Sequence, residues 1–398
     1  MQTIKKYPLV ILFLSIIFTA ALLRSTIVIV GPISEIIIFD LKISATNFGL
    51  ITTIPLIVFA LSSASIPFIA SKGGLINTLI GGLLLIMIGS LLRSIESYNI
   101  LLIGTIFVGF GISISNVLIP ALIKEYAGEH RAIFTSSYLC MQNIMASVAS
   151  GIAFFIAINV SWSFLMLIWI VPAIIAITLW FKYKKDTKAT NSSKNLSFAA
   201  WSIIKSLLKS KYAWALSMIM GLQSVLYYTS VTWLPKIALD NEFSQEFISF
   251  LMISFQLSPL PALFLVPILV KKIKQDSYMV LLAGIIILIG AVLLRMTQSE
   301  SLFLFATVLV SLGTGISFAW VVAIITNRSK DSQQASSLSA MSQTIGYSLA
   351  AIGPWLGGLL VDLTSDSKMI TIFMLIIGLV LMVTSIYLYL TRHKFSLA

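Results

Sequence analysis

The chain has 398 residues, of which 58% are hydrophobic and only 10% are charged. A soluble globule of this length needs more polar surface than that, so the bilayer is the expected solvent. A net charge of +12 would suggest nucleic-acid binding in a soluble protein, but in a membrane protein it follows from the retention of Lys and Arg in cytoplasmic loops. We therefore expect no nucleic-acid partner.

Twelve apolar segments are each long enough to cross a bilayer as a helix. Lys5-Lys6 before the first of them could belong to a signal peptide, but the apolar run continues too far and lacks a cleavage site, so we interpret it as the first helix. We predict spans over residues 8–38, 46–70, 75–92, 100–123, 132–157, 164–181, 213–234, 244–270, 278–294, 302–325, 335–361 and 370–390.

Three short motifs recur in the same order at an offset of about 200 residues. They are Leu91-Leu92-Arg93 and Leu293-Leu294-Arg295, Gly109-Phe110-Gly111-Ile112-Ser113 and Gly313-Thr314-Gly315-Ile316-Ser317, and Ser136-Ser137 with Met141 and Ser336-Ser337 with Met341. Such a repeat predicts an all-α integral membrane protein of twelve transmembrane helices in two pseudo-symmetric six-helix halves, which can rock about a site between them. We place the halves at residues 1–181 and 213–398, joined by a polar cytoplasmic linker over 182–212.

The basic residues indicate the orientation of these spans. Most Lys and Arg residues fall in the tails and in alternate loops on one side, whereas Lys42, Arg93, Lys236, Arg295 and Lys368 fall on the other. Because basic loops stay in the cytoplasm, both termini are predicted to be cytoplasmic. Since two halves already make a complete unit, we expect a monomer.

Arg24 is the most informative single residue, because a cation within an apolar span is costly and faces a cavity or a partner. The functional interpretation is that the guanidinium of Arg24 binds an anion or a dipole, and we call this role the anion hook. The structural alternative is that the side chain reaches the outer interface or pairs with Glu35 or Asp40 beyond the helix end. The apolar run continues through Gly31 and Pro32, so the guanidinium would have to extend along several helical turns to reach water. This favours the anion hook over the structural alternative.

No Asp or Glu lies near the middle of any predicted span, which disfavours a buried carboxylate proton relay and makes an anionic solute the natural partner of the guanidinium. No Gly-rich phosphate loop is present, so transport must use gradients rather than ATP, with a proton or another ion as a possible coupling partner. The single cysteine, Cys140, provides no disulfide or metal-binding pattern. We expect no cofactor and no metal.

Polar uncharged residues follow helical spacing and define faces that turn away from lipid, either as interhelical hydrogen bonds or as a cavity wall. Candidate substrate-binding residues are therefore Arg24, Asn116, Tyr138, Gln142, Gln223, Tyr227, Gln343 and Tyr347. Proline, glycine and anchoring residues can bend helices or gate the cavity, although ordinary enrichment of Gly and Pro in membrane helices explains most of them. The gating or structural candidates are Pro32, Pro55, Lys72, Pro120, Lys124, Trp233, Pro235, Gln256, Gly353 and Pro354.

Several of these motifs together resemble the cyanate permease and 2-nitroimidazole transporter family of the major facilitator superfamily. They are Leu23-Arg24 with Gly31-Pro32, the segment 50–55, the segment 116–124, Gly221-Leu222-Gln223-Ser224 with Tyr228 and Trp233-Leu234-Pro235, and the segment 338–343 with Gly346-Tyr347 and Gly353-Pro354. The resemblance implies a bacterial inner-membrane transporter of a small polar or anionic solute. It marks Arg24, Asn116, Gln223 and Gln343 as residues to test.

The chain departs from the superfamily in two places. Residues 70–74 lack the Asp of the Gly-rich motif that usually follows the second span, so the gate must be held differently, with Lys72 as one candidate. The fifth span lacks the Gly-Pro signature of proton-coupled drug exporters, because residues 147–151 contain no proline.

We therefore predict a secondary transporter that works by alternating access, and not an enzyme. The alternative within transport is a proton-coupled drug or metabolite efflux protein. From a different class, the chain could be a membrane sensor or a lipid scramblase built on a transporter fold, but a sensor would usually bring a soluble output domain and none is expected here. An intramembrane enzyme is disfavoured because the only histidines, His130 and His393, lie at the cytoplasmic side.

Overall fold

The computed structural model describes residues 6–187, 206–273, 277–329 and 332–391, and these residues form helices without a strand. The first half of the chain contributes α1 (Lys6–Leu23), α2 (Ser25–Val28), η1 (Gly31–Ile33), α3 (Ser34–Leu41), α4 (Ala45–Ser62), α5 (Ile66–Gly73), α6 (Leu75–Arg93), α7 (Tyr98–Tyr126), η2 (Gly128–His130), α8 (Arg131–Asn159), α9 (Trp162–Leu167) and α10 (Ile170–Thr187). The second half contributes α12 (Lys211–Asp240), α13 (Gln245–Leu257), α14 (Leu260–Lys272), α15 (Ser277–Met296), α16 (Glu300–Arg328), α17 (Ser332–Ala350), α18 (Ile352–Thr364) and α19 (Met369–Thr391).

These helices account for the twelve predicted spans, several of which are interrupted. The first span is α1 to α3, the second α4 and α5, the sixth α9 and α10, the eighth α13 and α14, and the eleventh α17 and α18. Eleven helical segments are long and apolar enough to cross a membrane. The twelfth span is α12, whose Gln, Ser, Thr and Tyr residues lower its hydropathy, and which is buried along nearly its whole length.

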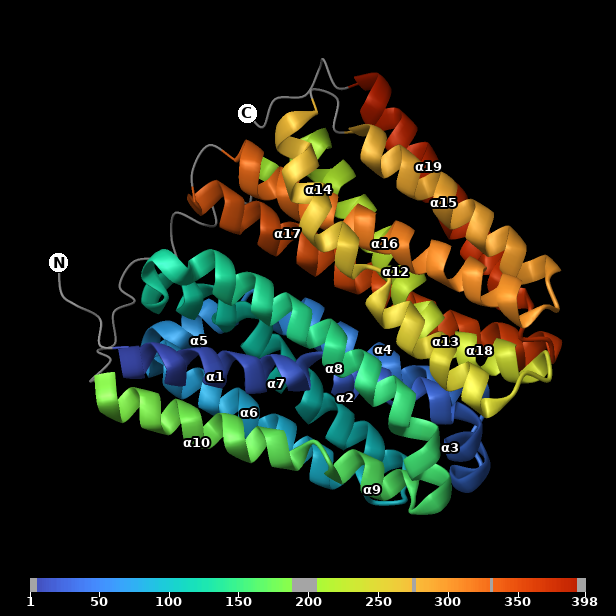
Figure 1. Cartoon of the computed structure of the whole chain (residues 1–398), viewed down its shortest axis with the longest axis horizontal. Coiled ribbons are helices and arrows are strands. Elements are labelled where there is room, and N and C mark those ends of the chain that lie inside the picture. The colour runs from blue at the N-terminus through green and yellow to red at the C-terminus, as the bar shows by residue number, and fades with distance from the viewer. Residues whose placement is uncertain (1–5, 188–205, 274–276, 330–331, 392–398) are drawn as a thin grey trace.

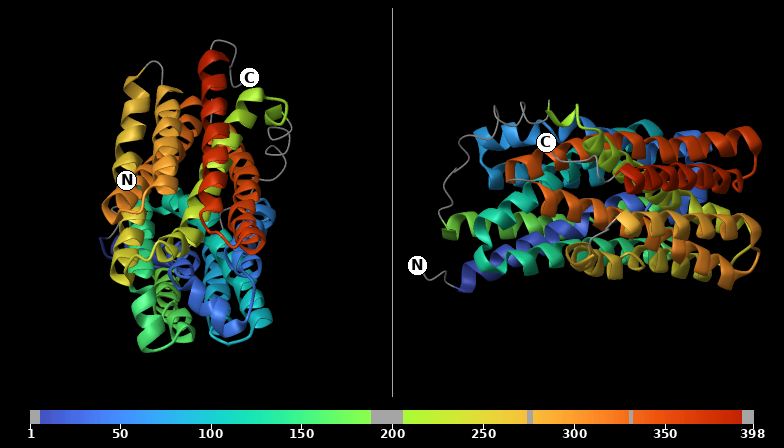
Figure 2. Two further views of the ribbon diagram at one scale, coloured as in Figure 1. Left: turned by 90° about the vertical axis from the view of Figure 1, so that its right-hand side faces the viewer. Right: turned by 90° about the horizontal axis from the view of Figure 1, so that it is seen from above.

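Figure 1 shows the helices in two groups, α1 to α10 and α12 to α19, with the helix axes roughly along the long direction of the molecule. The same two groups are seen from the end and from above in Figure 2. We call the end where α1 begins and α19 ends the proximal end, and the opposite end, which includes the turn between α3 and α4, the distal end. The predicted 182–212 linker lies largely outside the described residues, so its boundaries stay a prediction.

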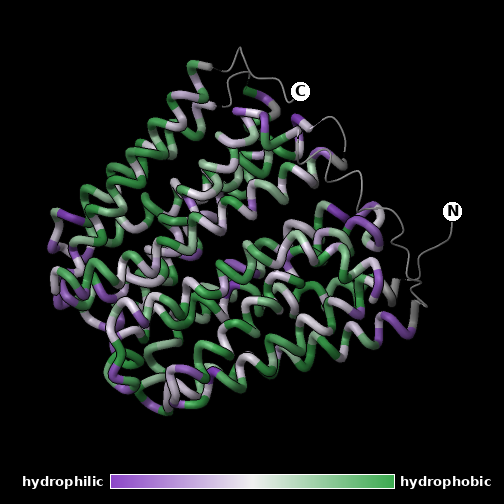
Figure 3. Tube along the Cα trace, turned by 180° about the vertical axis from the view of Figure 1, so that it is seen from behind, coloured by the Kyte–Doolittle hydropathy of each residue, from purple (hydrophilic) through white to green (hydrophobic). Residues whose placement is uncertain are grey.

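Hydropathy follows this arrangement. Figure 3 shows hydrophobic residues along the middle of the helices and hydrophilic residues gathered towards both ends of the bundle. Large apolar side chains such as Phe155 (69% exposed) and Val383 (61% exposed) lie on the outer surface. A chain that exposes such residues around its circumference needs a lipid solvent there.

The two halves repeat the same internal packing. A Cβ at Gly89 would meet the carbonyl of Gly104 and the side chain of Val108, and a Cβ at Gly290 would meet the carbonyl of Ala306 and the side chain of Val310. Small residues thus bring α6 against α7 and α15 against α16 in the same way. The contacts support the internal repeat that the sequence motifs indicated.

The halves meet mainly towards the distal end. Helix α4 packs against α17 and α18, α8 packs against α13, and η1 packs against α12. A Cβ at Gly31 would overlap the Val231 carbonyl, and one at Gly358 would overlap the Ala45 carbonyl. Towards the proximal end, α5 packs against α6 and α7, and α14 packs against α16, so these segments contact their own half.

Polar and aromatic contacts join the halves at the distal end. Asp362 accepts hydrogen bonds from the backbone N–H groups of Ala45 (3.0 Å) and Thr46 (2.8 Å) at the start of α4, a position where a carboxylate is favoured by the helix dipole. Lys236 pairs with Glu35 across the interface at 2.9 Å. The rings of Phe48 and Trp233 pack edge to face at 5.7 Å.

The gating and structural candidates divide between the two ends. Trp233 is fully buried and donates to the Pro354 carbonyl at 2.9 Å, and Pro32 is buried in η1, so these residues belong to the distal contact.

Lys72 lies in the last turn of α5 with its ammonium 4.4 Å from the centre of the Phe68 ring. Lys124 is exposed in the last turn of α7. Pro55, Pro120 and Pro235 lie inside continuous helices.

Candidate functional site

Arg24 occupies a break in the first span. Helix α1 ends at Leu23, and only the four residues of α2 separate Arg24 from the turn that leads into η1. Pro32 in η1 has no N–H to donate to the Val28 carbonyl, and its ring clashes with that carbonyl in a regular α-helix, so it favours an interruption at this point. Just after Arg24, Thr26 donates its hydroxyl to the Leu22 carbonyl at 2.7 Å, and back-bonding of this kind bends membrane helices. The sequence thus dictates an irregular backbone around the cation.

Two neutral groups from different helices hold the guanidinium. Arg24 Nη1 donates to Asn143 Oδ1 of α8 at 2.5 Å. The Arg24 Cζ lies 4.6 Å from the centre of the Tyr227 ring of α12, within the range of a cation–π contact. Asn143 in turn donates its Nδ2 to the Leu139 carbonyl at 2.9 Å, which fixes the orientation of its amide. Arg24 is therefore held between the two halves.

The Arg24 side chain nevertheless keeps part of its surface accessible, although the residues on either side of it are buried. Among the described residues, the two ion pairs involve Lys236 with Glu35 and with Asp240, and neither includes Arg24. Asp40 accepts a hydrogen bond from Trp162 at 3.0 Å. The alternative that Arg24 pairs with Glu35 or Asp40 is therefore wrong, because both carboxylates contact other residues at the distal end.

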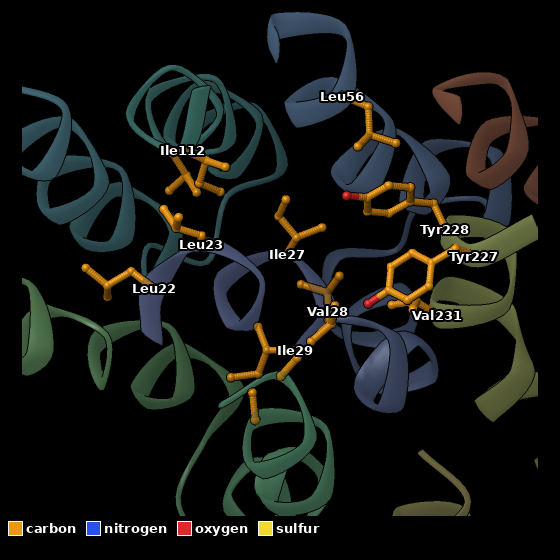
Figure 4. Packing of buried hydrophobic residues seen from close by; sticks show 14 of the residues in the cluster. Leu22, Leu23, Ile27, Val28, Ile29, Leu56, Ile112, Tyr227, Tyr228 and Val231 are labelled. Carbon is orange, nitrogen blue, oxygen red and sulfur yellow. The ribbon is translucent and has the colours of Figure 1, made fainter. Parts of the chain in front are cut away.

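Aromatic residues form a wall beside the guanidinium. Figure 4 shows Tyr227 and Tyr228 of α12 next to each other and facing the segment of the first span that carries Ile27 and Val28. The centres of the Tyr228 and Tyr347 rings are 6.3 Å apart, and the centres of the Tyr347 and Phe59 rings are 4.2 Å apart. Tyr138 is also close enough to Arg24 for the hydroxyl group to interact electrostatically with the guanidinium. The wall thus combines residues from both halves.

The phenol groups are themselves positioned by amides. Tyr138 donates to Asn116 Oδ1 at 2.8 Å, and Tyr227 donates to Gln256 Oε1 at 2.8 Å. Gln256 is fully buried and its Nε2 has no partner among the described residues. A buried amide donor without a partner is costly, which makes Gln256 a further group able to meet a ligand or an ordered water.

The structure does not bring all the predicted amides to Arg24. Gln223 is buried and donates to the Met220 carbonyl (3.0 Å) and Ser224 Oγ (2.7 Å), both within α12. Gln343 is half-buried and donates to Ser339 Oγ at 2.9 Å within α17. Gln142 is buried next to Asn143 and in contact with Tyr138. Arg24, Tyr138, Tyr227 and Tyr347 are the predicted residues that do gather.

Three residues of this region were not predicted from the sequence as site residues. Asn143 is the direct partner of Arg24, Tyr228 extends the aromatic wall, and Arg93 donates to the Thr26 carbonyl just after the break. The doublet Gln142-Asn143 was a usable signal, but neighbouring residues on a helix point in different directions and packing decides which one faces inward.

In the part of the chain that the structure describes, no group of three or more His, Cys, Asp or Glu residues could hold a metal ion.

Comparison with known proteins places this arrangement in a family. The family model of the Major Facilitator Superfamily matches residues 13–351 and 233–397. The chain belongs to the Major Facilitator Superfamily. The all-α fold of twelve helices in two six-helix halves is thereby confirmed, as is the resemblance to transporters of this superfamily.

Curated relatives within the superfamily cover most of the chain. It is 35% identical to the uncharacterized transporter YycB of Bacillus subtilis (strain 168) over 373 residues, 93% of this chain and 91% of that protein. It is 28% identical to the 2-nitroimidazole transporter of Escherichia coli (strain K12), over 89% of this chain and 88% of that protein. It is 23% identical to the cyanate transport protein CynX of Escherichia coli (strain K12), over 72% and 73%.

A solved structure of the superfamily has the same fold. A bacterial homologue of the human lysosomal transporter Spinster, in an inward-facing and unoccupied conformation, superposes with a TM-score of 0.80 at 13% identity, covering 99% of this chain and 98% of that one. The protein is therefore a multi-pass membrane transporter of the Major Facilitator Superfamily.

Proposed function

We propose that this chain is a secondary transporter that moves a small polar or anionic solute, of the cyanate-like anion or nitro-heterocycle class, across the bacterial inner membrane by alternating access. The observation that carries the proposal is Arg24, a partly buried residue at a helix break, whose guanidinium is held by an amide oxygen and a tyrosine ring rather than by a carboxylate. A buried cation with only neutral partners retains its attraction for an anion.

The shape of the site supports a small, flat or electron-rich solute. Tyrosine rings beside the guanidinium provide an apolar face with a hydroxyl at its edge, and Asn116, Tyr138 and Gln142 lie together on one side. Two relatives are named for cyanate and for 2-nitroimidazole, and a cyanate ion and a nitro group both present negative charge that a guanidinium can bind. Gln223 and Gln343 are proposed to reach the solute in another conformation, after their intrahelical hydrogen bonds are exchanged.

The contacts between the halves indicate which side of the transporter is closed in this conformation. Basic residues are concentrated at the proximal end, which we therefore assign to the cytoplasm together with both termini. With the distal end joined by Asp362, Lys236 and Trp233, the described conformation is then closed towards the outside. In this proposal the transporter works as a monomer and couples transport to a gradient of protons or another ion.

Replacement of Asn143 by Asp tests the anion hook. In Asn143→Asp a carboxylate would take the place of the amide oxygen that contacts Arg24 Nη1 at 2.5 Å, so the guanidinium would carry a permanent counter-ion. We expect the variant to accumulate normally but to lose uptake of cyanate and of 2-nitroimidazole in proteoliposomes by about tenfold or more, because the solute must now displace a carboxylate.

The matched control is Asn159→Asp, which places the same charge at the exposed distal end of the same helix, where Asn159 donates to its own helix. This control should transport both solutes like the wild type. Undiminished uptake by Asn143→Asp would contradict the hook. Uptake of neither solute by the wild type above that of protein-free vesicles would contradict the proposed solute class.

A further inference from the structure

Arg93 is a second buried cation that contacts the broken first span. It is the last residue of α6, only 3% of its surface is exposed, and its Nη1 donates to the Thr26 carbonyl at 2.7 Å. The contact joins residues 67 positions apart in the sequence. Neither ion pair of the described residues includes Arg93. The hydrogen-bond partner of Arg93 is thus the backbone of the first span.

The chain makes room for this side chain. A Cβ at Gly104 of α7 would lie 2.7 Å from the Gly89 carbonyl and 2.9 Å from both Arg93 N and Arg93 Cγ, so glycine at this position lets the end of α6, with the Arg93 stem, pack directly against α7. The position at the C-terminus of α6 also favours a cation, since the helix dipole is negative there. Close packing on one side and a favourable dipole on the other indicate that Arg93 is fixed rather than free.

The Thr26 carbonyl needs a donor because of the break. Across the break the backbone of the described residues makes hydrogen bonds from Ile29 N–H to the Ser25 carbonyl and from Ile33 N–H to the Val30 carbonyl, and no backbone N–H there bonds to the Thr26 carbonyl. Thr26 is fully buried. A carbonyl without a partner at this depth is costly, since neither water nor lipid can satisfy it.

The internal repeat supports this interpretation by contrast. Arg295 is the counterpart of Arg93 in the second half, near the end of α15, and it is half-buried rather than buried. The seventh span, which corresponds to the first, is α12, a continuous helix from Lys211 to Asp240. The one carbonyl inside this helix that loses its ladder donor to a proline is that of Val231, four residues before Pro235, and it lies against Gly31 of the first span. The deeply buried arginine therefore occurs in the half whose first helix is broken.

We propose that Arg93 is a positioning residue that holds the broken segment in place and thereby fixes where Arg24, two residues before Thr26, presents its guanidinium. The proposal rests on the proposed function in assuming that Arg24 binds the solute. Three groups then orient the segment: Arg93 through the Thr26 carbonyl, Asn143 through Arg24 itself, and α12 through the close approach of Val231 to Gly31.

A labelling experiment tests the position of residue 24 without any solute. In a Cys140→Ser background, which lacks the only cysteine of the chain, the thiol introduced by Arg24→Cys is modified with a negatively charged methanethiosulfonate from the cytoplasmic side. Adding Arg93→Met should change the rate of modification by about fivefold or more, because the segment is no longer held. Adding Arg295→Met should leave the rate unchanged, and an unchanged rate with Arg93→Met would overturn the proposal.

A second variant keeps the experiment decisive if Arg93→Met does not accumulate. Gly104→Ala would place a methyl group 2.9 Å from Arg93 Cγ and from Arg93 N, and 2.7 Å from the Gly89 carbonyl, so it would shift the end of α6 together with the Arg93 side chain without removing its charge. We expect this variant to change the labelling rate in the same direction. The same labelling rate as in the protein that carries only Cys140→Ser and Arg24→Cys would refute the positioning role of Arg93.

Transport measurements separate positioning from a purely structural role. In Arg93→Met the KM for the solute should rise roughly tenfold, with Vmax per protein molecule close to that of the wild type. Arg93→Lys should recover most of the affinity, since an ammonium can still donate to one carbonyl. Equal losses in KM and Vmax for Met and Lys variants would overturn the proposal. If the wild type transports neither cyanate nor 2-nitroimidazole, the proposed solute class fails, whereas the labelling rates still decide the role of Arg93.

Discussion

Arg24→Ala is expected to abolish transport while the protein still accumulates in the membrane. Removal of one partner from a buried, hydrogen-bonded charge contact costs about 2–5 kcal/mol, which corresponds to a loss of affinity of about 30-fold or more. The remaining wall of Tyr138, Tyr227 and Tyr347 supplies hydroxyl groups and rings but no positive charge. Uptake of labelled cyanate and 2-nitroimidazole into proteoliposomes, at equal amounts of inserted protein, measures the effect.

Arg24→Lys separates charge from geometry. An ammonium keeps the charge, but it lacks the planar fork that donates to Asn143 and stacks on the Tyr227 ring. We therefore expect little recovery of uptake. Full activity of the Ala variant would show that Arg24 is structural. Full activity of the Lys variant would show that charge alone is sufficient and that the fixed geometry has no role.

Gly31→Ala is expected to prevent the distal ends of the two halves from closing. The added Cβ would overlap the Val231 carbonyl of α12, which is backbone and cannot turn away as a side chain can. Overpacking at a close-packed contact typically costs about 1–3 kcal/mol, enough to change a conformational equilibrium by about fivefold or more. Transport should fall accordingly, because alternating access requires the closed state.

Spin labels at exposed distal positions measure this change directly. In a Cys140→Ser background, Phe39→Cys on α3 and Leu363→Cys on α18 report the separation of the halves, since these side chains are 82% and 73% exposed. Gly31→Ala should add a population with a longer distance. Gly81→Ala is the matched control, because nothing lies within 4 Å of a Cβ at that position. The same distance distribution for Gly31→Ala and the wild type would contradict the role given to this contact.

The fold follows from the sequence because its signal is distributed over the whole chain. Twelve apolar segments and three recurring motifs all predict the same architecture, and errors of a few residues at the ends of spans do not change it. The interruptions were harder to predict. The first span reads as one apolar run over residues 8–38, whereas the structure breaks it at Arg24 and again before Gly31. Pro32, which has no N–H to donate to the Val28 carbonyl, accounts for the second interruption.

The site was predicted only in part, because it depends on which face of each helix turns inward. Arg24 stands out as a charge in an apolar run, and Tyr227 and Tyr347 follow from helical spacing. Asn143 could not be distinguished from its neighbour Gln142 without packing. Arg93 was placed among the outer basic residues, because the sequence does not show that a carbonyl 67 residues away lacks a backbone partner.

The most direct test of the anion hook is binding to the purified protein in detergent, measured as the shift in melting temperature on adding cyanate or 2-nitroimidazole to the wild type and to Arg24→Ala. A solute that binds only the folded state raises the melting temperature, by an amount that grows with the logarithm of its concentration relative to Kd. We predict a concentration-dependent rise for the wild type and none for Arg24→Ala. Equal shifts in both proteins would contradict the central claim, because the solute would then bind without the guanidinium.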